Sequence, residues 1–164
     1  KTIKQKVKFK ASPEIIYMNK LLWIFLAFVS GAFLPIQAGL NSRLGKNIES
    51  PVFASFFSFL VGSIGLVTYI LLTKQTISIP GLKETPWQVW LGGLLGAFYV
   101  TVIILAFPKL GPGLTFGLVV AGQMIFSILL EHYNIMVAQQ NPINMMKILG
   151  VVLVVAGVVI IRNY

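Results

Sequence analysis

Polar side chains that could bind a solute occur inside two long apolar stretches of this sequence. In the run 21–41, Gln37 and Asn41 lie four residues apart and Ser30 precedes Gln37 by seven, which places all three on one helical face. Amide groups donate and accept hydrogen bonds without carrying a charge. Inside an apolar helix they can contact a polar solute, or they can join two helices at about 0.6 kcal/mol on average.

A second polar stripe lies in the run 114–131. Gln123, Ser127 and Glu131 recur at four-residue spacing, and His132, the single histidine of the chain, follows directly. An ionisable side chain within a membrane span is a functional candidate, so Glu131 and His132 are candidates for binding a proton or a cation. The alternative is that the pair marks a solvated helix end and has no such role.

A proline interrupts the first run near its middle. Pro35 has no N–H, so the carbonyl of Gly31 loses its helical partner, and we predict a kink at these two residues. A broken helix with amides on one face is tolerated in a membrane where it lines a cavity or packs on other helices.

The composition places these residues in a membrane protein. The chain has 164 residues, of which 57% are hydrophobic and 10% charged, whereas soluble domains carry about 25% charged residues. We predict an all-α bundle of five transmembrane helices, each close to the roughly 20 residues that cross a bilayer: 21–41, 52–73, 87–107, 114–131 and 143–161. The connections are too short for a soluble catalytic domain.

Charge and cysteine content exclude several other classes of protein. The net charge of +9 would suggest nucleic acid in a soluble chain, but the lysines lie between the runs and in the basic head, where they mark membrane orientation. The chain has no cysteine, one histidine and four acidic residues. We therefore predict no metal site, no cofactor and no enzymatic activity.

Residues 1–17 differ from the rest, residues 18–164, which form the predicted transmembrane domain. The head is basic, and Met18-Asn19-Lys20 reads like an ordinary start before a span. We interpret the head as disordered or not native. The alternative is a polybasic segment that binds lipid.

Small residues and prolines predict how the helices begin and pack. Ser50-Pro51, Thr85-Pro86 and Asn141-Pro142 each predict a capped helix start. Ser55 and Ser58 share a face with a glycine that lets helices approach closely. The predicted packing glycines are Gly62, Gly92, Gly96, Gly150 and Gly157.

Together these motifs resemble the drug/metabolite transporter superfamily and, within it, the YdcZ-like family of inner-membrane exporters. The resemblance covers residues 20–162, and no single motif in it is specific. It is carried by the ordered set Gly31, Pro35, Gln37, Asn41, Gly92-Gly93-x-x-Gly96, Pro108-x-x-Gly111, Gly122-Gln123, Glu131-His132 and Ala156-Gly157.

The resemblance implies a half-transporter in the bacterial inner membrane. Larger superfamily members carry ten helices as two inverted halves, and the small multidrug resistance relatives pair as antiparallel dimers. A five-helix chain would need a second, inverted copy or an inverted homologous subunit to build a midplane site. The small relatives use a carboxylate in their first helix, but no acid lies between Lys20 and Arg43 here. Proton-coupled cation antiport is therefore in question, and Glu131 is the remaining candidate.

The distribution of basic residues bears on orientation. In a five-span arrangement without the head, four lysines lie on the N-terminal side and four basic residues lie on the opposite side. A chain without bias could insert both ways. With the head included, the count is nine against four and favours an N-terminus inside.

Our leading hypothesis is a secondary transporter subunit that moves a small organic solute, of unknown identity, through an antiparallel dimer. Gln37, Asn41, Gln123 and Ser127 would contact the solute, and Glu131 would bind a proton or cation. The alternative is a non-transporting membrane scaffold, in which the same amides serve helix packing alone. An intramembrane enzyme is disfavoured because no carboxylate pair or nucleophile set is present.

Overall fold

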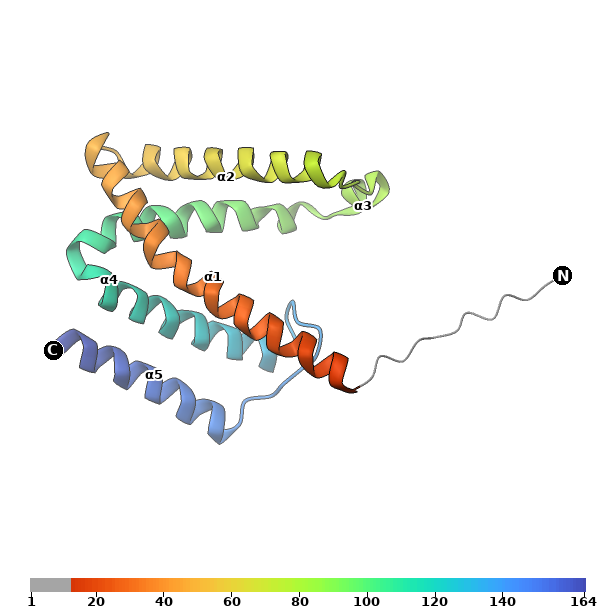
Figure 1. The fold of residues 1–164 in the computed structure, drawn as a ribbon. Coiled ribbons are helices and arrows are strands. Elements are labelled where there is room, and N and C mark those ends of the chain that lie inside the picture. Colours follow the sequence, from red (N-terminus) through yellow and green to blue (C-terminus); the bar gives the residue numbers. More distant parts are fainter. Residues whose placement is uncertain (1–12) are drawn as a thin grey trace. The chain divides into compact units, whose positions relative to one another are not determined.

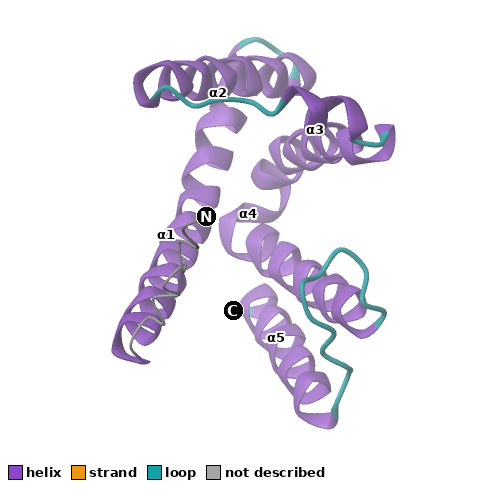
Figure 2. Cartoon of the chain, turned by 90° about the vertical axis from the view of Figure 1, so that its right-hand side faces the viewer, coloured by secondary structure: helices purple, strands orange, loops and turns teal. Residues whose placement is uncertain are grey.

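The computed structural model describes residues 13–164, and every regular element in this range is helical. The order along the chain (Figure 1) is α1 (Pro13–Asn47), α2 (Pro51–Thr73), α3 (Ile79–Glu84), a 3₁₀ turn (Trp87–Leu91), α4 (Gly92–His132) and α5 (Met145–Asn163). Loops serve as connectors, and the longest joins α4 to α5 (Figure 2). The prediction for the basic head falls largely on residues 1–12, which lie outside the described residues.

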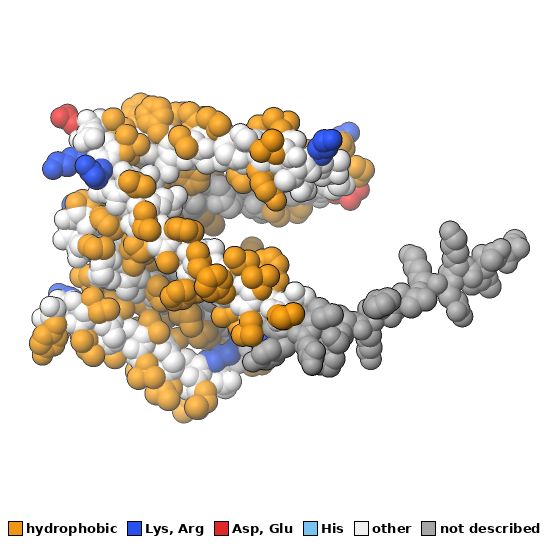
Figure 3. All heavy atoms as spheres, viewed as in Figure 1, with side chains coloured by type: hydrophobic (Ala, Val, Ile, Leu, Met, Phe, Trp, Pro, Cys, Tyr) orange, Lys and Arg blue, Asp and Glu red, His pale blue; other side chains and the backbone are white. Residues whose placement is uncertain are grey.

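Four helical segments of the described chain are long and apolar enough to cross a membrane: Met18–Asn47, Pro51–Thr73, Trp87–His132 and Met145–Asn163. Almost none of their large apolar side chains is buried by the chain itself. Hydrophobic side chains cover the helices in Figure 3, and the visible charged side chains lie near helix ends. Such a surface is matched by lipid rather than by water.

The chain forms two compact units, up to Ile36 and from Gln37 onward, and each is described by itself. In the first unit, Trp23, Phe25 and Phe28 are exposed, and the Ser30 hydroxyl donates to the Leu26 carbonyl at 2.7 Å. This bond satisfies the hydroxyl within its own helix.

The chain stays helical through Gly31 and Pro35, with Pro35 inside α1, and the kink at these residues stays a prediction. Proline removes a single intrahelical hydrogen bond. An apolar solvent offers no alternative partner to the remaining backbone groups, so the helix continues on both sides.

Of the three predicted helix starts, one is confirmed and two are wrong. Ser50 caps α2 and accepts from the Phe53 N–H at 3.3 Å, with Pro51 in the first turn. The Thr85 hydroxyl instead donates backward to the Gly81 carbonyl at 2.7 Å. The side chain of Asn144, not Asn141, caps α5 by accepting from the Lys147 N–H at 2.9 Å.

Helix α4 changes direction part-way along its length (Figure 1). Gly111 is the non-helical residue, with φ 75° and ψ 163°, a conformation nearly restricted to glycine. Pro108 and Pro112 flank it, and the rings of Phe107 and Phe116 meet edge to face across the bend at 6.4 Å. The 46-residue segment from Trp87 to His132 would measure about 69 Å if straight, more than twice the ~30 Å hydrocarbon core.

The bend divides the second unit into two groups of helices. We define the first helix group as residues 37–47 of α1, all of α2 and residues 92–110 of α4. Its buried apolar side chains are those of Ala38, Ala54, Ile103 and Ile104. We define the second helix group as residues 112–132 of α4 together with α5. Its buried side chains are those of Thr115, Ala121 and Val158.

Candidate functional site

A groove of about 420 Å³ opens within the first helix group. Its lining comes from α1, α2 and α4 and consists of Gln37, Ser58, Phe59, Gly62, Ser63, Leu66 and Val100. Gln37 is exposed, so its amide is available to a molecule in the groove. One amide and two hydroxyls therefore stand in a wall that is otherwise apolar, the composition typical of small-molecule sites.

Asn41 lies behind this groove rather than in it. Its side chain is 8% exposed, and its Nδ2 donates to the Ser58 Oγ at 3.0 Å. The bond joins α1 to α2 and fixes the hydroxyl of Ser58, which does line the groove. Asn41 therefore positions a residue of the groove. The sequence predicted that Asn41 itself would contact the solute.

A second polar contact joins α2 to α4. The hydroxyls of Ser55 and Thr101 lie 2.8 Å apart, and either can donate to the other. The hydroxyl that accepts across this contact can donate to the carbonyl four residues before it, that of Pro51 or Ala97. Sequence reasoning placed Ser55 and Ser58 on one face of a helix but did not select Ser63 or Thr101 as site residues. The spacing of Ser55 and Ser58 is a sequence pattern that indicates a shared polar face. No such pattern identifies Ser63 as a groove residue.

Gln123 and Ser127 do not line this groove. Both side chains are exposed on α4, in the second helix group. Among the described residues, neither side chain makes a hydrogen bond. An exposed amide and hydroxyl in the middle of an apolar helix require a partner, because lipid provides none.

Glu131 and His132 help to fasten the end of α4 to the start of α5. Lys147 Nζ donates to Glu131 Oε2 at 2.8 Å and to the Asn141 carbonyl at 2.7 Å. His132 Nδ1 accepts from the Ile143 N–H at 3.3 Å. Both ionisable candidates therefore have structural partners within the chain, and their role in ion coupling stays a prediction.

The predicted packing glycines differ in their surroundings. A Cβ added at Gly96 would meet the Phe59 ring at 3.4 Å, whereas an added Cβ would meet nothing within 4 Å at Gly62, Gly92, Gly150 and Gly157. The closest approaches occur at two other glycines: an added Cβ would lie 3.0 Å from Ile104 Cγ2 at Gly45 and 3.0 Å from Val158 Cγ2 at Gly117. Gly45 lies in no small-xxx-small pattern, but Gly117 lies in one, Gly113-x-x-x-Gly117-x-x-x-Ala121, which could have identified it.

The sequence was compared with known families and proteins. Residues 22–160 match the family described as "Putative inner membrane exporter, YdcZ". This chain belongs to the YdcZ family. The Inner membrane protein YdcZ of Escherichia coli (strain K12) is 28% identical over 119 residues, which cover 71% of this chain and 79% of that protein. No solved structure matches the chain.

The YdcZ match confirms the resemblance derived from the motifs. The matched range contains the groove, the amides of both helix groups and the contacts that join α4 to α5. The description is that of an exporter in the inner membrane, a transporter rather than an enzyme. Four candidate membrane-crossing helices agree with such a protein.

Proposed function

We propose that this chain is one subunit of a secondary transporter that exports a small organic solute. The observation that carries the proposal is the groove, in which the exposed amide of Gln37 stands beside the hydroxyls of Ser58 and Ser63. An amide and hydroxyls can bind a polar solute and release it again, because no single contact is strong. The family description supports the direction of transport.

The groove is incomplete in a single chain. Gln37 and Gln123 are both exposed on helices whose exposed side chains are mostly apolar, and a polar group facing lipid is unfavourable. A partner subunit that covers both faces removes this cost. We propose that the partner is an inverted copy, in which case Gln123 and Ser127 of one chain can face the groove of the other.

We further propose that the chain crosses the membrane five times, with the two segments of α4 on either side of Gly111 each making one crossing. Support comes from the non-helical backbone at Gly111 and the excessive length of the segment. Outside residues 1–17, the basic residues then divide evenly between the two sides, four and four. Such a balance is what dual insertion requires.

A non-transporting scaffold is the second candidate, and the Asn41–Ser58 bond favours it. That bond demonstrates that an amide in this chain can serve to join helices. If Gln37 and Gln123 do the same across an interface, their substitution alters assembly and leaves flux unchanged.

Extracellular metabolite profiles separate the two candidates. Cells that express the wild type, Gln37→Leu or Gln123→Leu at equal membrane levels are compared with empty-vector cells. Transport predicts metabolites that accumulate outside wild-type cells and fall to the empty-vector level in both variants. An unchanged profile in wild-type cells contradicts the transporter proposal. A wild-type profile equal to the empty-vector profile, together with lost dimerisation in the variants, supports the scaffold.

Topology is tested with a single cysteine, which the natural absence of cysteine makes unambiguous. Tyr164→Cys is labelled with an impermeant maleimide in intact cells and again after lysis, with and without residues 1–17. Partial labelling that lysis completes supports two orientations and an antiparallel homodimer. Complete or absent labelling in intact cells means a fixed orientation, so that the inverted half must be another protein.

A further inference from the structure

A second groove, of about 360 Å³, lies at the end of the first helix group where α1 meets α2. Its lining consists of Ser42, Gly45, Lys46, Pro51, Ile104, Leu105, Pro108 and Lys109. It shares no lining residue with the groove beside Gln37. Nothing in the proposed transport function depends on it.

The charge of this groove is entirely positive. Lys46 comes from the last turn of α1 and Lys109 from α4, two residues before the bend. No acidic residue lines the groove, and neither lysine forms an ion pair within residues 13–164. Two ammonium groups from different helices can together bind one phosphate group, since each is a compact point charge.

The remaining wall is apolar and firmly packed. Ile104, Leu105 and Pro108 form one side. Gly45, beneath them, is buried so closely that an added Cβ would lie 3.0 Å from Ile104 Cγ2. A ligand that fits must therefore combine an anionic head with an apolar body.

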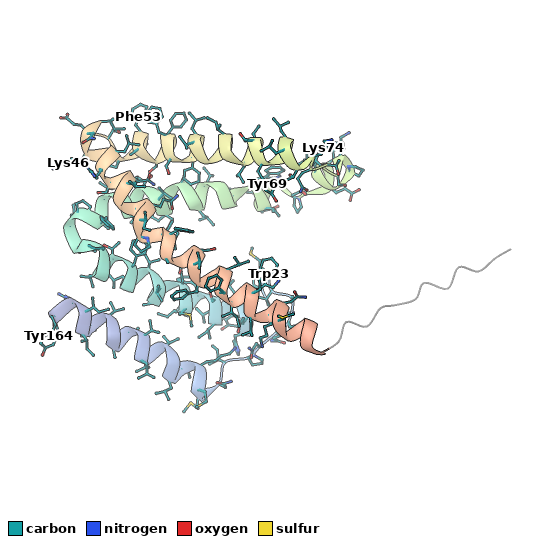
Figure 4. All side chains as sticks on the ribbon, viewed as in Figure 1. Trp23, Lys46, Phe53, Tyr69, Lys74 and Tyr164 are labelled. Carbon is teal, nitrogen blue, oxygen red and sulfur yellow. The ribbon has the colours of Figure 1, made fainter. Side chains whose placement is uncertain are left out.

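The position of the groove along the helices supports the same chemistry. Figure 4 places Lys46 beside the start of α2, whereas Lys74 lies at the opposite end of that helix. Helix ends lie at the level of lipid headgroups, where basic residues meet the phosphates of anionic lipids. From the groove, its charge and this depth, we propose that Lys46 and Lys109 bind the phosphate headgroup of an anionic phospholipid, with an acyl chain along Ile104 and Leu105.

Native mass spectrometry of the purified full chain in detergent tests this assignment. Phosphatidylglycerol and phosphatidylcholine with identical acyl chains are titrated separately. We expect phosphatidylglycerol to bind more tightly, and Lys46→Gln with Lys109→Gln to weaken it roughly 30-fold, given the usual contribution of a lysine at an anionic surface. Binding of phosphatidylcholine should not change.

The matched control is Lys74→Gln with Lys83→Gln, which removes the same charge elsewhere in the chain and should preserve tight binding. Lys46→Arg with Lys109→Arg keeps the charge and should also preserve it, even if the neutral variant does not fold. Equal loss in both glutamine doubles contradicts a defined site, as does equal affinity for the two lipids. Complete displacement of phosphatidylglycerol by inorganic phosphate would assign the groove to a free anion and overturn the lipid proposal.

Discussion

A close glycine contact occurs in both helix groups, but polar side chains also join the helices along their length in the first group, whereas in the second they do so only at the helix ends. Asn41 bonds to Ser58, and Ser55 meets Thr101, so that α1, α2 and α4 are linked by short polar contacts. In the second group, Val158 of α5 packs on Gly117 of α4. The polar contacts there lie at the helix ends, around Lys147.

The difference bears on which polar groups remain available for a solute. In the first group Asn41 is engaged in packing and Gln37 is exposed at the groove. In the second group Gln123 and Ser127 are both exposed, without a partner among the described residues. A polar residue inside a membrane span is therefore evidence for binding only after its hydrogen bonds within the chain have been counted.

The largest expected effect is on transport. Gln37→Leu and Gln123→Leu should each lower export by about 5- to 150-fold, because an unpaired polar group of the solute costs about 1–3 kcal/mol. Efflux of the metabolite identified by profiling is measured from proteoliposomes, with Val120→Leu on an exposed apolar position as the control. If only Gln37→Leu lowers export, the site belongs to the first helix group alone.

The second largest expected effect is on the bend between the two helix groups. Gly111→Ala should lower the free energy of unfolding by about 1–3 kcal/mol, since the backbone at φ 75° and ψ 163° excludes a side chain. Unfolding is followed by circular dichroism during titration with sodium dodecyl sulfate. Gly122→Ala, an open helical position, should be neutral or stabilising by up to about 1 kcal/mol. Equal stability of the two variants would mean that the bend is not a fixed feature.

Glycine contacts in the two groups should also differ in their tolerance of a methyl group. At Gly45 an added Cβ meets Ile104 at 3.0 Å and the Pro51 backbone at 3.6 Å, whereas at Gly117 it meets only the Val158 side chain. Gly45 is buried and Gly117 only half-buried, so Ile104 has less room to shift than Val158. Gly45→Ala should therefore destabilise by about 1–3 kcal/mol and Gly117→Ala by less. The same titration measures both, with Gly150→Ala as the control. A larger loss at Gly117 would reverse the comparison.

The smallest expected effects are the pairwise couplings. A double-mutant cycle of Asn41→Leu and Ser58→Ala should give about 0.6 kcal/mol. A cycle of Glu131→Gln and Lys147→Met should give about 0.2–1 kcal/mol, because both side chains are partly exposed, at 37% and 18%. High salt should reduce only the second coupling. A salt-dependent first coupling would show that the distinction between the groups is wrong.

Much of the fold follows from the composition and periodicity of the sequence. The sequence predicted the start of α2 at Ser50-Pro51 and a break close to Pro108 and Pro112. Both were predictable because proline and capping residues act on the backbone locally. The sequence did not predict that the chain stays helical through Pro35, because a helix that has lost one hydrogen bond continues or ends according to its surroundings.

The site was predictable only in part. The spacing of Gln37 and Asn41 identified one polar face, but their different roles depend on Ser58, which belongs to another helix. The partner of Glu131 is Lys147, sixteen residues away and beyond an irregular loop. Contacts between helices depend on rotation and depth, and a single sequence specifies neither of them directly.

The single-residue joint at Gly111 has a consequence for biosynthesis. In the five-crossing arrangement, no hydrophilic loop separates the two segments of α4, and Lys109 is the one charged residue between Gly92 and Leu130. Insertion of this hairpin therefore requires the translocation machinery to carry little more than one lysine to the far side. That requirement applies to the orientation with the N-terminus inside. In the inverted orientation Lys109 stays on the cytoplasmic side, and the connections that contain Lys74 and Lys83 are carried across instead.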